Sequence, residues 1–290
     1  MNGTSTSPSN QDGSSTAEGS TKPDITLALQ IVHNPRSDAA TRQKASDFLE
    51  TQKNSPNAAL CGHELAADKS QAAEVRHFGL SLLEHNVRHN WHSFSDEQAL
   101  EVRNSIVTLC QSVTEDDPLF LRNKVAHLLV ELAKKDWVRS WYDLDSILVK
   151  IWNESTLYKE LVLNVLEGLS EDVFVREDSA AAIRGQDFNN AVVEIFTPAS
   201  AFAGGQNKRR MPLRADADGW LSKISQLLIG SKAGAGADRG EKACIQKALA
   251  TMRSCFTWIM APAIISTHCL ESIFTCLKST DQDILLVGRM

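Results

Sequence analysis

The sequence offers few groupings of residues that could do chemistry, and the most suggestive of them is a histidine cluster. His85, His89 and His92 are spaced at i, i+4 and i+7, and Glu84 directly precedes the first of them. Histidines on one helix face can bind zinc, as in the zinc hydrolases. The zinc-protease pattern needs Glu directly after the first His, and this sequence has Asn86 there. A solvated helix face explains the cluster better, so we expect no metal; a metal-dependent hydrolase stays open as a rival interpretation.

Three further motifs resemble functional sites only loosely. The Gly-rich stretch 230–240 lacks the G-x-G-x-x-G spacing of a nucleotide-binding turn, and no strand pattern precedes it. The basic run Lys208, Arg209 and Arg210 could contact RNA or act as a localisation signal, but such runs usually lie in solvated loops. Cys269 and Cys276 share a helix face and are expected to be buried thiols. The sequence therefore predicts no catalytic residue, no cofactor and no enzyme.

The composition favours a protein that binds other proteins. The formal net charge is −6 and the sequence pI is about 5.8, which argues against broad contact with a phosphate backbone. The six cysteines form no CxxC pair, and no apolar run reaches the roughly 20 residues that a membrane span needs. The start of the chain lacks the apolar core of a signal peptide. We therefore expect a soluble intracellular protein with no membrane contact.

Helical periodicity sets in after a polar start. Residues 1–22 contain no Leu, Ile, Val or Phe, so we expect a disordered tail over 1–23. Further on, Ser95 with Gln98 forms a capping box, and Pro118 opens another helix. One apolar stripe follows i, i+3, i+4, i+7 and i+8 and predicts a helix running to about Asn90; its members are Val75, Phe78, Gly79, Leu82 and Leu83.

The helices are expected to come in pairs that recur about every 40 residues, which is the period of HEAT or armadillo repeats. A single pair cannot bury its own apolar stripe, and stacking buries it. The fold class predicted is all-α: a right-handed α-solenoid of HEAT-like antiparallel helix pairs with a disordered N-terminal tail. The region 187–242 is less regular, and further helices are predicted over 221–228, 242–260 and 266–277. The apolar run at 284–287 looks like a helix that has been cut, so we expect the front portion of a longer solenoid.

Two blocks carry a resemblance to a known family. The stretch EVRHFGLSLLEHNVRHNW, residues 74–91, is similar to the N-terminal domain of the importin-β family of nuclear transport receptors. Residues 121–148 resemble the exportin-1/importin-β-like domain that follows, with a Lys-rich helix end and then Trp137 and Trp141. The family often has Pro after each Trp, where this chain has Val138 and Tyr142, so the turn is expected to differ. Residues 161–173 and 248–260 resemble the exportin-5 group within the family.

The resemblance implies a division into a tail, residues 1–23, importin-β N-terminal-like HEAT repeats, 24–112, and exportin-1/importin-β-like HEAT repeats, 113–290, truncated at the C-terminus. It also implies a fragment of a nuclear export receptor that binds the GTPase Ran in its GTP form. Cargo, either protein or structured RNA, and nucleoporins would be partners of the full-length receptor. The implied protein is a monomer that shuttles between nucleus and cytoplasm through the nuclear pore. A truncated Ran-binding remnant, or a helical scaffold without transport activity, is the alternative.

The resemblance places Ran on the inner side of the solenoid, which is formed by the second helix of each pair. We assign to that side the polar positions that helical phase puts opposite two apolar stripes. Each position taken alone could equally be an ordinary exposed polar residue. The predicted Ran-binding residues are Gln98, Glu101, Asn104, Asp143, Asp145 and Lys150.

Overall fold

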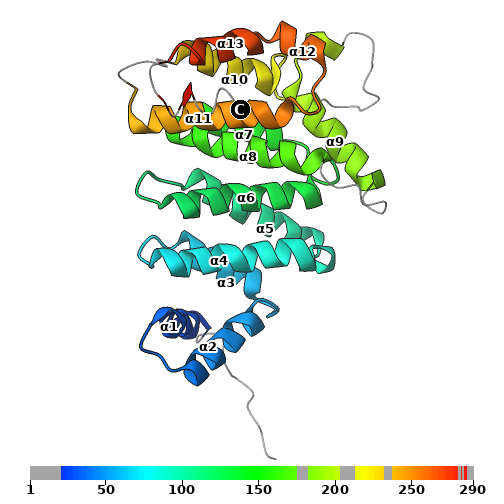
Figure 1. The fold of residues 1–290 in the computed structure, drawn as a ribbon. Coiled ribbons are helices and arrows are strands. Elements are labelled where there is room, and N and C mark those ends of the chain that lie inside the picture. The colour runs from blue at the N-terminus through cyan, green and yellow to red at the C-terminus, as the bar shows by residue number, and fades with distance from the viewer. Residues whose placement is uncertain are drawn as a thin grey trace, which may run out of the picture. The chain divides into compact units, whose positions relative to one another are not determined.

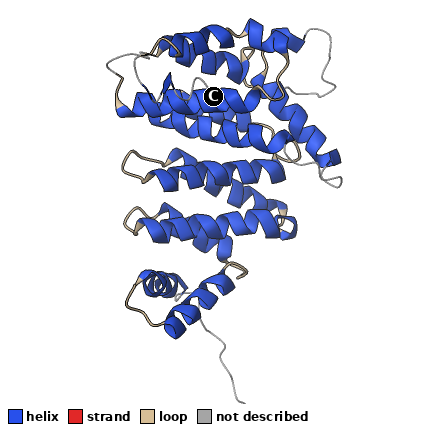
Figure 2. Cartoon of the chain, viewed as in Figure 1, coloured by secondary structure: helices blue, strands red, loops and turns tan. Residues whose placement is uncertain are grey.

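The structure is a computed structural model that describes residues 21–174, 182–202, 213–231, 237–279, 282 and 284–285. Within these residues the regular elements are helices, and the only β-type pairing is an isolated bridge between Trp137 and Trp141 (Figures 1 and 2). None of the described helices is both long enough and apolar enough to span a membrane. The chain divides into two compact units, Met1–Ser55 and Pro56–Met290, and each is described by itself.

The first unit contains two helices, α1 (Thr21–His33) and α2 (Ala39–Gln52), which pack against each other. Asp38 caps α2, because its carboxylate accepts a hydrogen bond from the Thr41 amide at 2.9 Å. Helix α1 begins at Thr21, so the last three residues of the tail predicted over 1–23 are helical. Residues 1–20 lie outside the described part of the chain.

The second unit begins with three helix pairs in which each first helix packs on its second. The second helices also stack on one another in chain order, α4 on α6 and α6 on α8 (Figure 1). This arrangement confirms the predicted all-α solenoid of HEAT-like pairs. The pairs are α3 (Ala58–Ala67) with α4 (Ala73–His85), α5 (Asp96–Gln111) with α6 (Leu119–Asp136), and α7 (Leu144–Trp152) with α8 (Thr156–Phe174).

Local sequence signals explain where several helices begin and how closely they approach. The capping box predicted at Ser95 and Gln98 is present at the start of α5. Pro118 directly precedes α6, as predicted. Gly79 lies in the apolar stripe of α4, where α4 meets α3. A Cβ at this position would come within 2.6 Å of the Gly62 carbonyl oxygen of α3. Only glycine lets these two backbones approach so closely.

The segment after α4 differs from the single helix predicted to reach about Asn90. The α-helix ends at His85 and continues as a π-helical turn, η1 (Asn86–Asn90), and a short 3-10 turn, η2 (Trp91–Ser93). Asn86 is buried, and its side-chain amide donates to the Leu82 carbonyl oxygen at 2.9 Å. Asn86 continues the apolar stripe of Gly79, Leu82 and Leu83, and this hydrogen bond satisfies its buried amide.

The turn between α6 and α7 has a conformation at Val138 that excludes proline, which the family often has at this position. Val138 adopts a φ of 72°, and its amide donates to the Trp141 carbonyl oxygen at 2.9 Å. Proline is fixed near −65° and has no amide proton, so it cannot occupy this position. Whether this turn differs from the family's turn stays a prediction.

The remainder of the second unit is less regular, as predicted. Its helices are α9 (Ala182–Phe196), η3 (Ala199–Phe202), α10 (Gly219–Gly230), α11 (Arg239–Cys255), α12 (Ala261–Ser266) and α13 (Cys269–Cys276). Helix α11 packs beside α8, and α13 packs beside α10 (Figure 1). The helix predicted over 266–277 is present as α13, but it begins three residues later, after His268, which adopts a φ of 58°. Helices α4, α6, α8 and α11 form one continuous stack, which we call the second-helix row.

Candidate functional site

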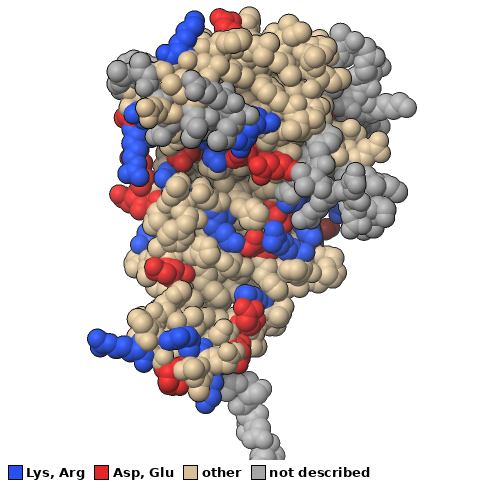
Figure 3. Space-filling model, viewed as in Figure 1, with Lys and Arg blue, Asp and Glu red and all other residues tan. Residues whose placement is uncertain are grey.

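The second-helix row carries a chain of ion pairs between successive repeats, which we call the ion-pair ladder. Between α4 and α6, Glu84 accepts from Lys124, and His127 Nε2 lies 3.1 Å from Glu84 Oε1. One turn further, Arg88 Nε donates to Glu131 Oε2 at 2.8 Å, and Lys134 Nζ lies 2.6 Å from Glu131 Oε1. Positive and negative side chains are accordingly interleaved on this face (Figure 3).

Both carboxylates of this part of the ladder are strongly biased towards the charged form. The hydrogen bond to His127, helped by Lys124, lowers the pKa of Glu84 to about 2. Burial alone would raise the pKa of Glu131, but the hydrogen bonds from Arg88 and Lys134 outweigh it and lower the pKa to about 2. These carboxylates are therefore ionised at neutral pH and hold neighbouring repeats together.

The ladder continues along the row. Between α6 and α8, Arg122 NH1 lies 3.1 Å from Glu160 Oε2. Between α8 and α11, Lys247 Nζ lies 2.7 Å from Glu167 Oε2. Every step of the second-helix row thus contains at least one ion pair that joins two helices. The carboxylates of these pairs are largely buried and their cations partly exposed, so the pairs fix the register between repeats.

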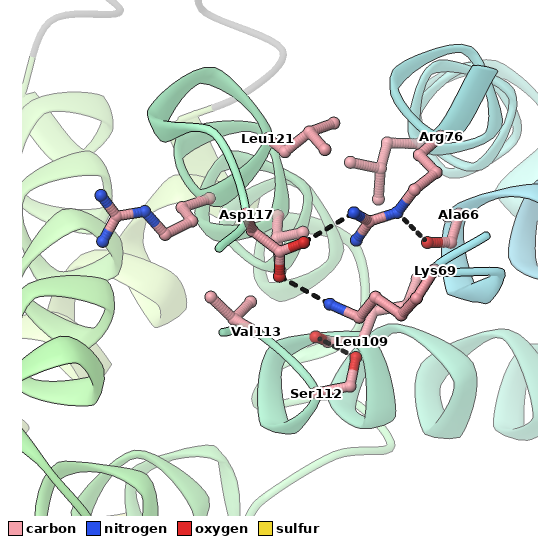
Figure 4. Close-up of a pocket in the computed structure, with 11 residues that line it drawn as sticks. Ala66, Lys69, Arg76, Leu109, Ser112, Val113, Asp117 and Leu121 are labelled. Atoms are coloured by element: carbon pink, nitrogen blue, oxygen red, sulfur yellow. Dashed lines mark hydrogen bonds and ion pairs between the residues drawn. The ribbon is translucent and has the colours of Figure 1, made fainter. Parts of the chain in front are cut away.

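A second joint lies where the α3–α4 and α5–α6 turns meet, and its centre is Asp117 (Figure 4). Asp117 accepts from Lys69 Nζ and from Arg76 NH1, both at 2.6 Å, and from the Thr114 amide at 2.8 Å. Burial opposes ionisation, but these donors outweigh it and lower the pKa of Asp117 to about 2. The cavity beside it has a volume of about 10 Å³, room for about one water molecule. This is a structural joint between repeats rather than a ligand site.

Five of the six predicted Ran-binding residues are exposed, but their helices are the first members of their pairs and not the second. Gln98, Glu101 and Asn104 lie on α5, Lys150 lies on α7, and Asp143 immediately precedes α7. Helices α5 and α7 are the first helices of their pairs, because α5 pairs with α6 and α7 with α8. The assignment of these residues to second helices is therefore wrong. Whether they contact a partner stays a prediction.

The sixth residue, Asp145, does not lie on the surface. Its side chain is buried at 2% exposure; Oδ1 accepts from Trp220 Nε1 at 2.5 Å and Oδ2 from the Ala215 amide at 2.6 Å. Burial raises the pKa of Asp145 to about 6. The expectation that Asp145 avoids the buried side of its helix is wrong. Helical phase could not reveal its donors, which come from a segment about 70 residues further along the chain.

The other motifs singled out from the sequence form no site in the described residues. The rings of His85 and His89 lie 4.7 Å apart, but among the residues that the structure places, no three His, Cys, Asp or Glu side chains are grouped to hold a metal. Cys269 and Cys276 are buried, as predicted. Lys208, Arg209 and Arg210 lie outside the described residues, as do residues 232–236 of the Gly-rich stretch.

Sequence reasoning missed the residues of the ion-pair ladder, although a signal for them exists. The partners in Lys124–Glu84, Arg88–Glu131 and Arg122–Glu160 are 40, 43 and 38 residues apart. This separation is the period of the repeat itself. A search for opposite charges one repeat apart would have identified all three pairs.

Two family models match successive parts of this helical array. The importin-β N-terminal domain matches residues 45–112, and the exportin 1-like protein family matches residues 118–197. The chain belongs to the importin-β superfamily. The two matched segments cover the three regular helix pairs and end after α9, so the family signal coincides with the first part of the second-helix row.

Curated relatives agree with this membership. The chain is 28% identical over 271 residues to protein MSN5 of Saccharomyces cerevisiae, an alignment that covers 88% of this chain and 22% of MSN5. It is 31% identical over 154 residues to exportin-5 of Mus musculus, covering 52% of this chain and 13% of that protein. The chain therefore spans less than a quarter of the length of either relative.

Proposed function

We propose that this chain is the Ran-binding end of a nuclear export receptor, and that it binds Ran in its GTP form. As part of a longer receptor it would take part in moving protein or RNA cargo between nucleus and cytoplasm, with nucleoporins as further partners. The observation that carries the proposal is the second-helix row: its first three helices, α4, α6 and α8, lie within the two matched family segments, and the resemblance assigns Ran to second helices.

The proposed contact surface is the exposed polar edge of α6 in this row. Asn123 and His127 are exposed on α6, and Arg88 is exposed on the neighbouring η1 turn. A mixture of charged and neutral polar groups of this kind suits a protein surface better than a phosphate backbone. The predicted residues of α5 and α7 form the competing surface on the first helices.

The proposed activity is binding without chemistry. Ran and cargo would be coupled through the relative positions of the repeats, since a partner that spans several second helices favours one arrangement of them. The ion-pair ladder lies between those same helices, so bound Ran would act directly on the contacts that set their register. In an export receptor, Ran-GTP and cargo would bind together.

Calorimetric titration of the chain with Ran tests the proposal. Ran loaded with a non-hydrolysable GTP analogue is expected to bind with 1:1 stoichiometry, and Ran loaded with GDP is expected not to bind. Equal binding of the two forms of Ran would contradict the proposal. So would the absence of binding by folded, monomeric protein, and that result would favour a helical scaffold without transport activity.

A matched pair of substitutions distinguishes the two surfaces. Asn123→Lys on α6 and Asn104→Lys on α5 make the same chemical change at exposed positions in neighbouring helices of one pair. We expect Asn123→Lys to weaken Ran binding by about tenfold, which is about 1.4 kcal/mol, and Asn104→Lys to leave it unchanged. The reverse result would move the contact to the first helices.

A further inference from the structure

Two adjoining cavities form a groove in the second unit, at the side where α8 and α11 begin. Their volumes are about 310 Å³ and about 330 Å³, and both are lined by Lys159, Gln226 and Leu227. Each volume lies at the lower end of the range for ligand pockets, roughly 300–1,000 Å³. The groove contains no ladder residue and none of the predicted Ran-binding residues, so it is a separate feature of the molecule.

The groove has an apolar floor and a polar rim. Cys244 and Ile245 are buried beneath it, and Leu227 is half-buried beside them. Thr156 and Gln226 are exposed along its edges. An extended polypeptide matches this arrangement, because its side chains can reach the floor while its backbone groups meet polar partners at the rim.

One cation in the groove is not neutralised. Lys159 forms no ion pair within the part of the chain that the structure describes, and its Nζ lies 5.9 Å from the centre of the Trp152 ring. The other lysine of the groove, Lys223, is paired with Asp216 at 2.5 Å. Glu241 also lines the groove; its carboxylate accepts from the Asp238 amide at 3.2 Å in the cap of α11 and keeps its negative charge. The groove therefore presents a single available ammonium group.

The aromatic neighbour of Lys159 is held rigidly. Trp152 is buried and meets Trp220 edge-on, with ring centroids 5.4 Å apart. Trp220 is in turn fixed by its hydrogen bond to Asp145. The Lys159 ammonium group therefore lies beside a fixed aromatic ring at one end of the groove.

We propose that this groove binds an extended acidic peptide segment. One carboxylate of the peptide sits on Lys159, and a neighbouring apolar side chain rests on the floor beside Leu227. The chain as a whole carries a net charge of −6, so an acidic peptide gains nothing from bulk electrostatics and must be held locally. The proposal does not depend on Ran binding, and it is tested without Ran.

A pair of labelled peptides provides the first test. The probe is a fluorescein-labelled peptide with the core Leu-Glu-Glu-Leu, and its partner carries Leu-Gln-Gln-Leu. Fluorescence anisotropy with the full chain is expected to show saturable binding of the acidic peptide, and at least tenfold weaker binding of the amide peptide. If neither peptide binds, or if both bind equally, the groove does not recognise acidic segments.

Substitutions then locate the binding. Lys159→Gln should weaken binding of the acidic peptide about tenfold, and Gln226→Glu, which places a like charge at the rim without changing size, about threefold. Lys44→Gln removes the same charge from exposed α2 and is the control. Joining Gln226→Lys to Lys159→Gln should restore part of the affinity. Loss of affinity in the Lys44 variant equal to that in the Lys159 variant, with both folded by circular dichroism, would overturn the assignment.

Discussion

Ion pairs join consecutive second helices both in the regular repeats, residues 56–174, and in the irregular region, residues 182–279. The two regions differ in how many residues separate the partners of a pair. Ladder pairs within the regular repeats are 38 to 43 residues apart. The pair between α8 and α11 is 80 residues apart, because α9, η3 and α10 intervene. Helix α11 nevertheless packs beside α8 as the next member of the row. The fold therefore preserves the stacking of second helices rather than the length of the repeat.

The two regions also satisfy buried carboxylates differently. In the regular repeats, Glu84 and Glu131 are paired with cations, and the pKa of each falls to about 2. Where α7 meets the irregular region, Asp145 accepts only from the neutral N–H groups of Ala215 and Trp220, and burial raises its pKa to about 6. Neutral donors compensate a buried charge less well than cations do, so the junction is the electrostatically weaker part.

The largest expected effect comes from the point where the regular repeats meet α9. Trp137 is 3% exposed, and its ring lies edge-on to Phe188 with centroids 5.8 Å apart. Trp137→Ala is expected to lower the free energy of unfolding by about 3–5 kcal/mol, because it leaves a large cavity. Urea denaturation would measure the loss. Tyr142→Ala, at an exposed site in the same turn, is the control and should change stability by less than about 0.5 kcal/mol.

The pH dependence of stability should separate the two regions. Asp145 binds a proton more tightly when folded, so its contribution is fully present below about pH 3.8 and is lost as pH rises through about 6, a change of about 2–3 kcal/mol. Glu84 and Glu131 behave in the opposite way. Their contribution is present above about pH 4.5 and is lost as pH falls towards 2. Of these three carboxylates, only Asp145 changes its contribution between pH 5 and 6.5. Burial lowers the pKa of His77 from 6.5, so His77 has the opposite effect in this range and remains in every variant compared.

Asp145→Asn is the variant that isolates this contribution. Asp216 and Lys223 also act electrostatically on Asp145, but both remain in the variant. Unfolding measured from pH 4.5 to 7 should lose its downward slope in Asp145→Asn and keep it in Asp143→Asn, where the carboxylate is exposed. An unchanged slope in Asp145→Asn would show that burial does not raise the pKa of Asp145.

The smallest expected effect compares two steps of the ladder. Glu131→Gln breaks contacts with Arg88 and Lys134 at a buried carboxylate and should cost about 1–2 kcal/mol. Glu167→Gln breaks one contact with Lys247 and should cost less than about 1 kcal/mol. Thermal unfolding of the two variants gives the difference. Equal losses would mean that each step of the ladder contributes the same free energy. The ladder would then not distinguish the regular repeats from the irregular region.

Much of the fold could be predicted from the sequence because each helix carries its own apolar stripe and local signals for its ends. Ser95 with Gln98 and Pro118 marked helix starts correctly. The surface was harder to predict, because helical phase identifies an apolar stripe but not which polar neighbours another segment will cover. Asp145 looked like a surface residue until residues 213–220 supplied its donors. The sequence also did not show whether a helix is the first or the second of its pair, because this depends on whether it packs on the helix before it or on the helix after it.

The ion-pair ladder makes the mechanics of the second-helix row sensitive to salt. Its pairs lie between consecutive second helices, and α3 and α5, the first helices of two pairs, also pack against each other. Added salt screens exposed charges and leaves apolar packing largely intact. Raising the ionic strength should therefore weaken the contacts between second helices. The stiffness of the second-helix row would then depend on the concentration of salt around the protein.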